Sequence, residues 1–310
     1  MLSRVASHLY WMARYLERAE NMARILDVGQ LLALVSRGED SEATAIEPLV
    51  ITNTLDDFDA TGRARTPGEV ACYLAWDALH ASSIFNCLHG TRENARAVRA
   101  DITTEMWEDI NNTWLQLLQK RHQDHPPADN DFFEWVKERS HLFHGITFST
   151  LRRDQPYHFI RLGTFIERAD NTARILSAKQ STLGAGRTDN DITDYYRLSA
   201  VLRSVSAFEA YRDTYREGVD ELRVAELLIV DPTLPRSLRF CFDEIVRALA
   251  MLPGASAKPA RRLAATMLAN LEFADIEEIY GQGYQAFLER FLAETAQLGQ
   301  ALHEAYLEPK

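Results

Sequence analysis

Residues 15–26 read YLERAENMARIL, and residues 165–176 read FIERADNTARIL. Eight of these twelve positions are identical at an offset of 150 residues, which is far more agreement than shared composition produces. The sequence therefore indicates an internal duplication, and we expect the fold to be organised around two copies of this Glu-Arg segment.

Both copies show the apolar periodicity of an α-helix. Leu16, Ala19, Ala23 and Leu26 are three or four residues apart, and the second copy has apolar residues at the same places. Alanines spaced in this way allow a second backbone to approach closely. We therefore expect the two helices to touch near the centre of the molecule, related by an approximate twofold axis.

The same helical spacing continues through most of the chain, and no segment alternates strictly as a half-buried strand does. We predict an all-α helical bundle in which residues 1–310 form a single domain with two internally related halves. The repeat helices are expected at residues 3–36 and 155–183, where they form a pseudo-twofold Glu-Arg pair. Other predicted helices include 67–88, 91–100 and 235–252.

Composition excludes several classes of protein. The net charge is -11 and basic residues are interspersed with acidic ones, which argues against a nucleic-acid-binding surface. The three cysteines are far apart, so the sequence suggests neither a disulfide framework nor a cysteine-rich zinc site. No run reaches the roughly 20 apolar residues of a membrane span. We expect a soluble cytoplasmic protein, and self-association stays open.

A polar stripe borders the apolar one in both copies. It consists of an acid, an amide and an arginine at positions i, i+4 and i+7, namely Glu17, Asn21 and Arg24 in the first copy and Glu167, Asn171 and Arg174 in the second. The acid and the arginine of one copy are about 10 Å apart by helical rise, too far for a direct bond. We therefore predict crossed pairs of Glu17 with Arg174 and of Glu167 with Arg24.

Two interpretations of these charged residues stay open. Ion pairs at i and i+4 on a helix surface are common and contribute only a few tenths of a kcal/mol, which favours a structural role. A solvated face, however, needs only charge, whereas both copies keep acid, amide and arginine together. Arg18 and Arg168, which directly follow the motif glutamates, are therefore included among the candidate binding residues.

The two motifs resemble the paired Glu-Arg motif of the bacterial Alpha-E domain family. Further segments resemble landmarks of that family, namely residues 1–6, 9–11 and 92–96, Trp107, Asn111, Gly145 and residues 235–237. The resemblance therefore covers nearly the full chain. One departure within the repeat is Thr164, which stands at the position that Arg14 has in the first copy.

Membership of this family would imply an α-helical protein encoded beside, or fused to, a circularly permuted ATP-grasp-like protein. Transglutaminase-like proteins often belong to the same setting. The resemblance thus implies peptide or amide-bond chemistry carried out by a partner, and it names no activity for the helical domain itself.

A second group of basic residues is predicted on a helix at residues 91–100. Arg92, Arg96 and Arg99 lie at i, i+4 and i+7 with Glu93 and Asn94 between them, so three guanidinium groups would share one helix face. Such a face suits carboxylate or phosphate oxygens, although pairing with neighbouring acids is an equal alternative.

Arg236 is a further candidate for binding an anion. Pro235 suits the first turn of a helix, so Arg236 would lie at the positive end of that helix. Simple capping of the helix is the competing interpretation.

No cofactor or metal site is predicted. Gly281-Gln282-Gly283 is too sparse for a phosphate-binding loop. Residues 138–141 contain one Glu-x-x-His motif, whereas the di-iron sites of helical bundles use two. The leading functional hypothesis is thus an accessory subunit that binds an ATP-grasp-like partner or an acidic ligand. The alternatives are a peptide-directed enzyme with Glu17 or Glu167 as general base, for which a raised pKa is expected, and a purely structural scaffold.

Overall fold

The computed structural model describes residues 1–35, 39–184, 191–216, 218–254 and 256–308. Within these ranges the chain forms fourteen α-helices, one π-helical turn at the C-terminal end and no strand, so the predicted all-α fold is confirmed. None of the described helices has both the length and the apolar character needed to cross a lipid bilayer. The helices of the first half are α1 (Ser3–Val35), α2 (Glu39–Thr52), α3 (Leu55–Ala60), α4 (Pro67–Trp76), α5 (Ile84–Ala97), α6 (Thr104–Arg121) and α7 (Asn130–Thr150).

The second half begins with the other repeat helix. Its elements are α8 (Gln155–Gly184), α9 (Asp191–Ser204), α10 (Phe208–Tyr215), α11 (Glu221–Val230), α12 (Leu238–Met251), α13 (Lys258–Glu272), α14 (Ile276–Leu302) and the π-helical turn η1 (His303–Leu307). The described parts of α1 and α8 agree with the predicted repeat helices, and Ser36, the last residue of the first prediction, lies outside the described residues.

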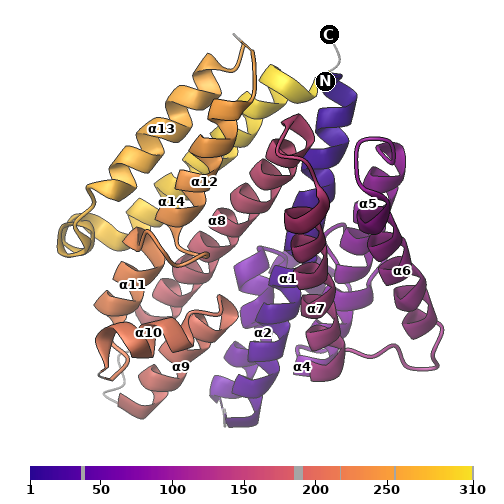
Figure 1. The fold of residues 1–310 in the computed structure, drawn as a ribbon. Helices are drawn as coiled ribbons and strands as arrows, with labels where there is room; N and C mark the ends of the chain where they lie inside the picture. The colour runs from indigo at the N-terminus through magenta and orange to yellow at the C-terminus, as the bar shows by residue number, and fades with distance from the viewer. Residues whose placement is uncertain (36–38, 185–190, 217, 255, 309–310) are drawn as a thin grey trace.

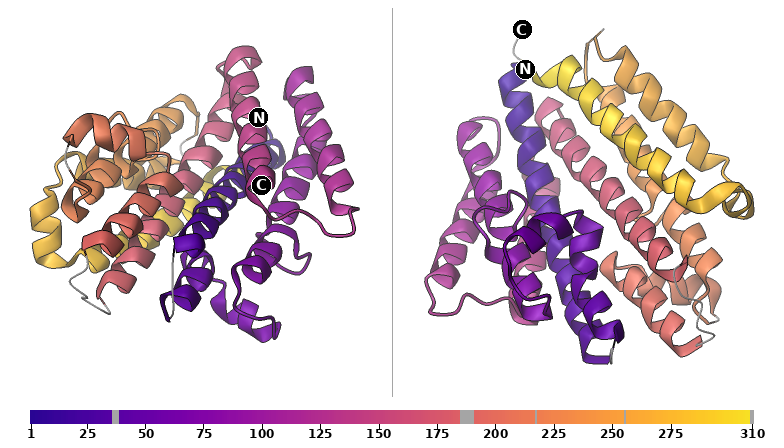
Figure 2. Two further views of the ribbon diagram at one scale, coloured as in Figure 1. Left: turned by 90° about the horizontal axis from the view of Figure 1, so that it is seen from below. Right: turned by 180° about the vertical axis from the view of Figure 1, so that it is seen from behind.

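Helices α1 and α8 lie side by side through the middle of the molecule (Figure 1). Helices α5 and α7 pack on α1, and α12 and α14 pack on α8. The view from behind shows the same arrangement, with the first half on one side of the pair and the second half on the other (Figure 2). The predicted contact between the two repeat helices is therefore confirmed.

The two central helices run in the same direction. The amino group of Met1 donates to Gln155 at the start of the pair, and the Cα of Gly163 lies against the backbone of Tyr10 further along. A Cβ placed on Gly163 would lie 2.3 Å from the carbonyl oxygen of Tyr10 and 3.1 Å from the Cβ of Ala13. Only glycine allows this closest approach of the two backbones.

The alanine stripes are buried, but they do not form the contact between the two repeat helices. Ala19, Ala23, Ala169 and Ala173 are each 0% exposed, as the sequence predicts for an inward-facing stripe. Glu17 and Asn21 lie on the side of α1 that faces α8. Ala19 lies two residues from each of them, so at about 100° per residue it points to the opposite side of the helix. The prediction that these alanines mediate the contact is therefore wrong, and the close approach of the two backbones occurs at Gly163.

The two halves also match in the lengths of their elements. Helices α4 and α11 have 10 residues each, and α5 and α12 have 14 residues each. Across the centre, α2 of the first half contacts α8, and α9 of the second half contacts α1. These matches support an internal duplication, whereas a twofold axis relating the complete halves stays a prediction.

The predicted helices at 67–88 and 91–100 are wrong in their boundaries. The chain leaves α4 at Asp77 and enters α5 after Ser83, whose hydroxyl accepts from the backbone N–H of Asn86 and caps the helix. The loop between them carries Ser82, which becomes part of the site described below. Apolar periodicity continues on both sides of this loop, so the pattern alone conceals the break.

The close approach at Gly163 leads to a stability prediction. Gly163→Ala forces α1 and α8 apart, and we expect a loss of about 1–3 kcal/mol in the free energy of unfolding, the usual cost of overpacking. Gly145→Ala is the matched control, since it lies on an exposed face of α7 with nothing near its Cβ position. That control should gain up to about 1 kcal/mol from helix propensity. Urea unfolding measures both, and equal stability of the two variants would contradict the close contact.

Candidate functional site

The motif glutamates and arginines form crossed ion pairs between α1 and α8. Arg168 donates from Nε and Nη2 to the two carboxylate oxygens of Glu17, both at 2.8 Å. Arg18 makes the same bidentate contact with Glu167, at 2.6 and 3.0 Å. Each glutamate is thus held by the arginine that follows the other one in the duplicated motif.

The prediction of crossed pairing is right in principle and wrong in its partners. Glu17 does not pair with Arg174, nor Glu167 with Arg24. Arg24 instead binds Glu20 of its own helix, and Arg174 binds Asp170 of its own helix. Since α1 and α8 run in parallel and in register, Glu17 lies beside the second motif, while Arg174 lies two turns further along.

The first centre is the network around Glu17. It comprises Glu17, Glu20, Asn21, Arg24, Arg168 and Arg236. Arg236 reaches into it with Nη2 at 2.5 Å from Glu20 and Nη1 at 2.7 Å from the amide oxygen of Asn21. Nη1 also lies 3.1 Å from Glu17, so Arg236 joins both carboxylates and the amide.

The backbone around Arg236 explains why its side chain points inward. Helix α12 starts at Leu238, with Ser237 as its N-cap, so the prediction that Pro235 occupies the first turn is wrong. The carbonyl of Arg236 accepts from the hydroxyl of Thr172 on α8. This bond ties the loop to α8 and directs the guanidinium toward α1. Burial lowers the pKa of Arg236, and Glu20 and then Glu17 oppose that effect.

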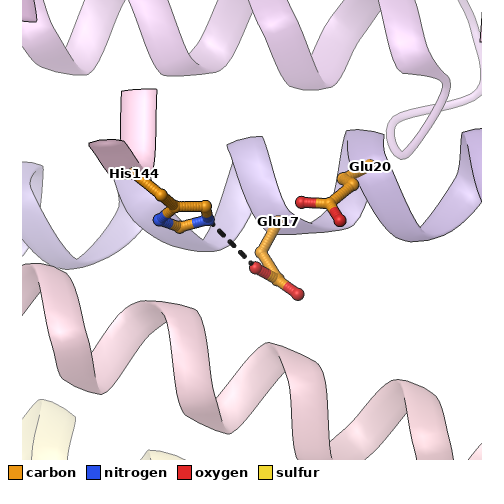
Figure 3. A group of neighbouring side chains, drawn as sticks. All are labelled: Glu17, Glu20 and His144. Atoms are coloured by element: carbon orange, nitrogen blue, oxygen red, sulfur yellow. Dashed lines mark ion pairs between the residues drawn. The ribbon is translucent and has the colours of Figure 1, made fainter. Parts of the chain in front are cut away.

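Helix α7 contributes three residues that the sequence did not single out for this site. Ser140 donates to Glu20 at 2.5 Å, and the Nε2 atom of His141 lies 3.6 Å from the same carboxylate. His144 lies one turn further, with Nε2 at 3.4 Å from Glu17 (Figure 3). Their i, i+1 and i+4 spacing defines one helix face, a signal that becomes informative only once α7 is known to pack on α1.

Among the described residues, one group has the side chains and spacing of a metal site. Ligand atoms of Glu17, Glu20 and His144 lie within 4.8 Å of one another (Figure 3). Arg168 and Arg236 already bind Glu17, however, and Arg236 also binds Glu20. A divalent cation would have to displace these guanidinium groups or lie beside them, and like charges at that distance repel strongly. The arrangement therefore favours ion pairing over metal binding.

The second centre is the corresponding network around Glu167. It comprises Arg14, Arg18, Glu167, Asp170, Asn171 and Arg174. Arg14 donates from Nε to Glu167 at 2.7 Å, so this glutamate is bound by two arginines of α1. Arg14 is not among the predicted site residues. The sequence does show, however, that the second copy of the repeat has Thr164 at the position of Arg14.

The arginines keep the buried glutamates ionised. Burial works to raise the pKa of Glu167, but Arg14 and Arg18 outweigh it, and the pKa falls from 4.5 to about 2. At Glu17 and Glu20, burial is likewise outweighed, with Arg168 the largest opposing influence on Glu17 and Arg236 on Glu20, so both pKa values are lowered. These carboxylates therefore carry full negative charge at neutral pH.

The Arg92 group lies apart from both centres. Arg92 donates to Asn111 of α6 and to the adjacent Glu93, and Arg96 lies 3.7 Å from the same glutamate. Asn94 contacts His8 of α1, which precedes Glu17 by nine residues, or about 13 Å along the helix. The prediction that three arginines share one helix face is wrong, because only Arg92 and Arg96 lie on α5.

The end of α5 accounts for this difference. The helix finishes at Ala97, so Arg99 lies beyond it and covers the ring of Trp107 instead. Arg96 and Arg99 are both exposed, and the side chain of Arg96 is 67% exposed.

Comparison with known proteins identifies one family and a few relatives. The family model described as a predicted alpha-helical domain with a conserved ER motif, named Alpha-E, matches residues 1–307. An uncharacterized protein of Mycobacterium bovis is 26% identical over 312 residues, covering 94% of this chain and 35% of the relative. Uncharacterized proteins of two Mycobacterium tuberculosis strains show the same identity and coverage. This chain thus spans about a third of the length of these curated relatives, and no solved structure matches it.

The depressed pKa of Glu167 leads to a prediction for acid. A carboxyl whose pKa falls from 4.5 to about 2 on folding contributes about 3 kcal/mol above the unfolded pKa, and loses that contribution as the pH falls through the folded one. Glu167→Gln removes this titration. We expect the variant to be less stable than the unsubstituted chain at neutral pH, and to lose less stability between about pH 5 and pH 3.

Urea unfolding across that pH range measures the effect. Glu108→Gln is the control, because it removes a carboxyl group from an exposed position on α6. The control should follow the unsubstituted chain throughout. A Glu167→Gln variant that loses as much stability on acidification as the unsubstituted chain would contradict the pairing described for Glu167.

Proposed function

The chain belongs to the Alpha-E family, and from this premise we propose that it is a non-catalytic accessory subunit of a peptide- or amide-bond-forming system. Its partner is proposed to be a circularly permuted ATP-grasp-like protein, with a transglutaminase-like protein as a further candidate. The Glu, Arg and Asn side chains of the polar centres would bind an acidic ligand or an acidic part of the partner.

The observation that carries this proposal is that arginines already bind both motif glutamates. A general base at neutral pH needs a pKa near the working pH and free access to a proton. Glu17 and Glu167 have lowered pKa values, and each is held by a bidentate contact with an arginine. The enzymatic alternative requires the opposite, a carboxyl whose pKa is raised by its pocket. The network therefore suits binding and support better than proton transfer.

The lengths of the relatives provide separate support. In the Mycobacterium bovis protein the matched region is 35% of the chain. A domain that forms one part of a longer chain is suited to working beside other domains, because covalent linkage raises their effective concentration for each other. In a shorter chain the same contact would have to form between separate subunits.

We propose the exposed arginines of α5 as the contact region for the partner. Arg96 projects into solvent, while Arg92 is anchored by Asn111 and stacks over Trp107 at 6.0 Å. A partly anchored guanidinium loses little conformational freedom on binding and can pair with carboxylates in a defined geometry. An acidic patch on the partner would fit this edge.

Co-expression with the ATP-grasp-like protein expected from the family resemblance tests the proposal. We expect the two proteins to elute together in size-exclusion chromatography at micromolar concentration. Arg92→Ala combined with Arg96→Ala should weaken binding by roughly tenfold or more in calorimetry, because two paired charges are lost. The double variant Arg262→Ala and Arg290→Ala is the control, since it removes the same charge from exposed positions on α13 and α14.

Each outcome distinguishes the three functional hypotheses. Separate elution of the two proteins would contradict a partner subunit. Turnover of a peptide by this chain alone, abolished by Glu17→Gln in a folded variant, would support the enzymatic alternative. Co-elution that neither arginine pair affects would favour a scaffold that docks through other surfaces.

A further inference from the structure

The two centres contain the same numbers of charges but obtain them differently. Each has two carboxylates and three arginines, namely Glu17, Glu20, Arg24, Arg168 and Arg236 in the first, and Glu167, Asp170, Arg14, Arg18 and Arg174 in the second. The third arginine of the first centre, Arg236, comes from the loop before α12. In the second centre it is Arg14, which comes from α1 itself.

The loops that approach the two centres are equivalent in length and in their hydrogen bonds. One runs over residues 77–83 and the other over residues 231–237. Each starts with an aspartate that accepts from the backbone N–H two residues on. Each ends with a serine that caps the following helix. Counted from these shared ends, Ser82 occupies the place of Arg236.

This exchange of arginine for serine leaves the second centre hollow. In the first centre the guanidinium of Arg236 lies between Glu20 and Asn21. In the second, a cavity of about 280 Å³ is lined by residues that include Arg18, Ser82, Glu167, Asp170, Asn171 and Arg174. That volume is sufficient for a small organic acid or for the end of a side chain.

The charges around the cavity favour an anion. Arg18 and Arg174 line the cavity together with Glu167 and Asp170, and Arg14 binds Glu167 from outside the lining. The centre as a whole therefore has three positive charges and two negative ones. One bound monoanion would neutralise this centre, whereas a cation would raise its positive charge further. A dianion would leave an excess of negative charge beside two carboxylates in a partly buried site, where repulsion is strong.

Hydrogen-bond donors without partners point the same way. Arg236 can only donate, so the atom of Asn21 that faces it is the amide oxygen, and the Nδ2 group of Asn21 is left buried and unpaired among the described residues. Asn21 also lines the cavity. Ser82 accepts from Arg18 at 3.2 Å, which leaves its own hydroxyl proton available.

Asn171 adds a second amide to the wall of the cavity. It is 8% exposed, and its Nδ2 group has no partner in the described part of the chain. A buried donor without an acceptor is destabilising, and an acceptor oxygen brought by a ligand would remove that cost. The two asparagine amides thus bring to the cavity donors that no residue in the described part of the chain accepts.

We propose that the cavity of the second centre binds the carboxylate of a small monoanionic ligand, such as an acidic side chain or the C-terminus of a peptide. The carboxylate would accept from Arg174, Ser82 and the asparagine amides. This inference deepens the proposed function by naming the ligand class and by confining it to one centre, because Arg236 already fills the other. It does not depend on a protein partner.

NMR titration of the full chain alone tests the proposal. N-acetylglycine serves as the monoanion, N-acetylglycinamide as its neutral equivalent, methylguanidinium as a mimic of Arg236, and inorganic phosphate as a competing anion. The side-chain NH₂ signal of Asn171, identified by its loss in Asn171→Asp, reports on the cavity. We expect this signal to shift with N-acetylglycine at up to about 50 mM, the range of weak small-ligand binding, and much less with the other three compounds.

Ser82→Arg provides the sharpest variant, because it places in the second centre the residue that fills the first. We expect it to weaken N-acetylglycine binding by roughly tenfold or more, whereas Ser149→Arg, which adds the same charge on an exposed face of α7, should leave binding unchanged. Arg174→Gln should also weaken binding roughly tenfold. This second variant decides the matter if Ser82→Arg does not fold, as checked by circular dichroism.

Several results would overturn the proposal. They are the absence of any shift with N-acetylglycine, tighter binding of methylguanidinium or phosphate, or binding that is insensitive to Arg174→Gln. Since no partner protein is present, each of these results leaves the proposed partner interaction standing.

Discussion

Two carboxylates buried between parallel helices constrain the rest of this structure. Glu17 and Glu167 are both less than a tenth exposed, and an unpaired charge in such a position costs several kcal/mol. Each can be neutralised by the motif arginine of the other helix only if α1 and α8 lie in parallel and in register. Gly163 makes that close approach possible. The surrounding helices then pack on a pair whose geometry is set by these contacts.

The duplicated motif supports two centres that have diverged. Arg236 closes the first, and Arg14 supplies the corresponding charge in the second without filling the same space. Replacing a long loop side chain by Ser82 therefore opens a cavity while the charge stays the same. Duplication followed by such an exchange allows one copy to keep the fold together and the other to acquire a binding role.

Much of the fold follows from the sequence, whereas much of the site does not. The repeat and its helical spacing predict both central helices, their contact and the exchange of charges between them. The actual pairs depend on the direction and register of two helices, and a helical pattern carries neither. For that reason the spacing predicts Arg24 and Arg174 as the partners of the glutamates, whereas Arg18 and Arg168 hold them in the structure. The contributions of Ser140, His144 and Ser82 depend on which elements pack together across long sequence distances.

A double-mutant cycle on Glu17 and Arg168 tests the central claim most directly. Glu17→Gln, Arg168→Met and the double variant are compared in urea unfolding, with Glu17 and Arg174 as a matched pair that does not touch. For a buried bidentate ion pair we expect each single variant to lose about 3–5 kcal/mol in the free energy of unfolding. The Glu17–Arg168 pair should show a coupling energy of about 2 kcal/mol or more, and the Glu17–Arg174 pair little coupling. Equal coupling in the two pairs, or none between Glu17 and Arg168, would contradict the account.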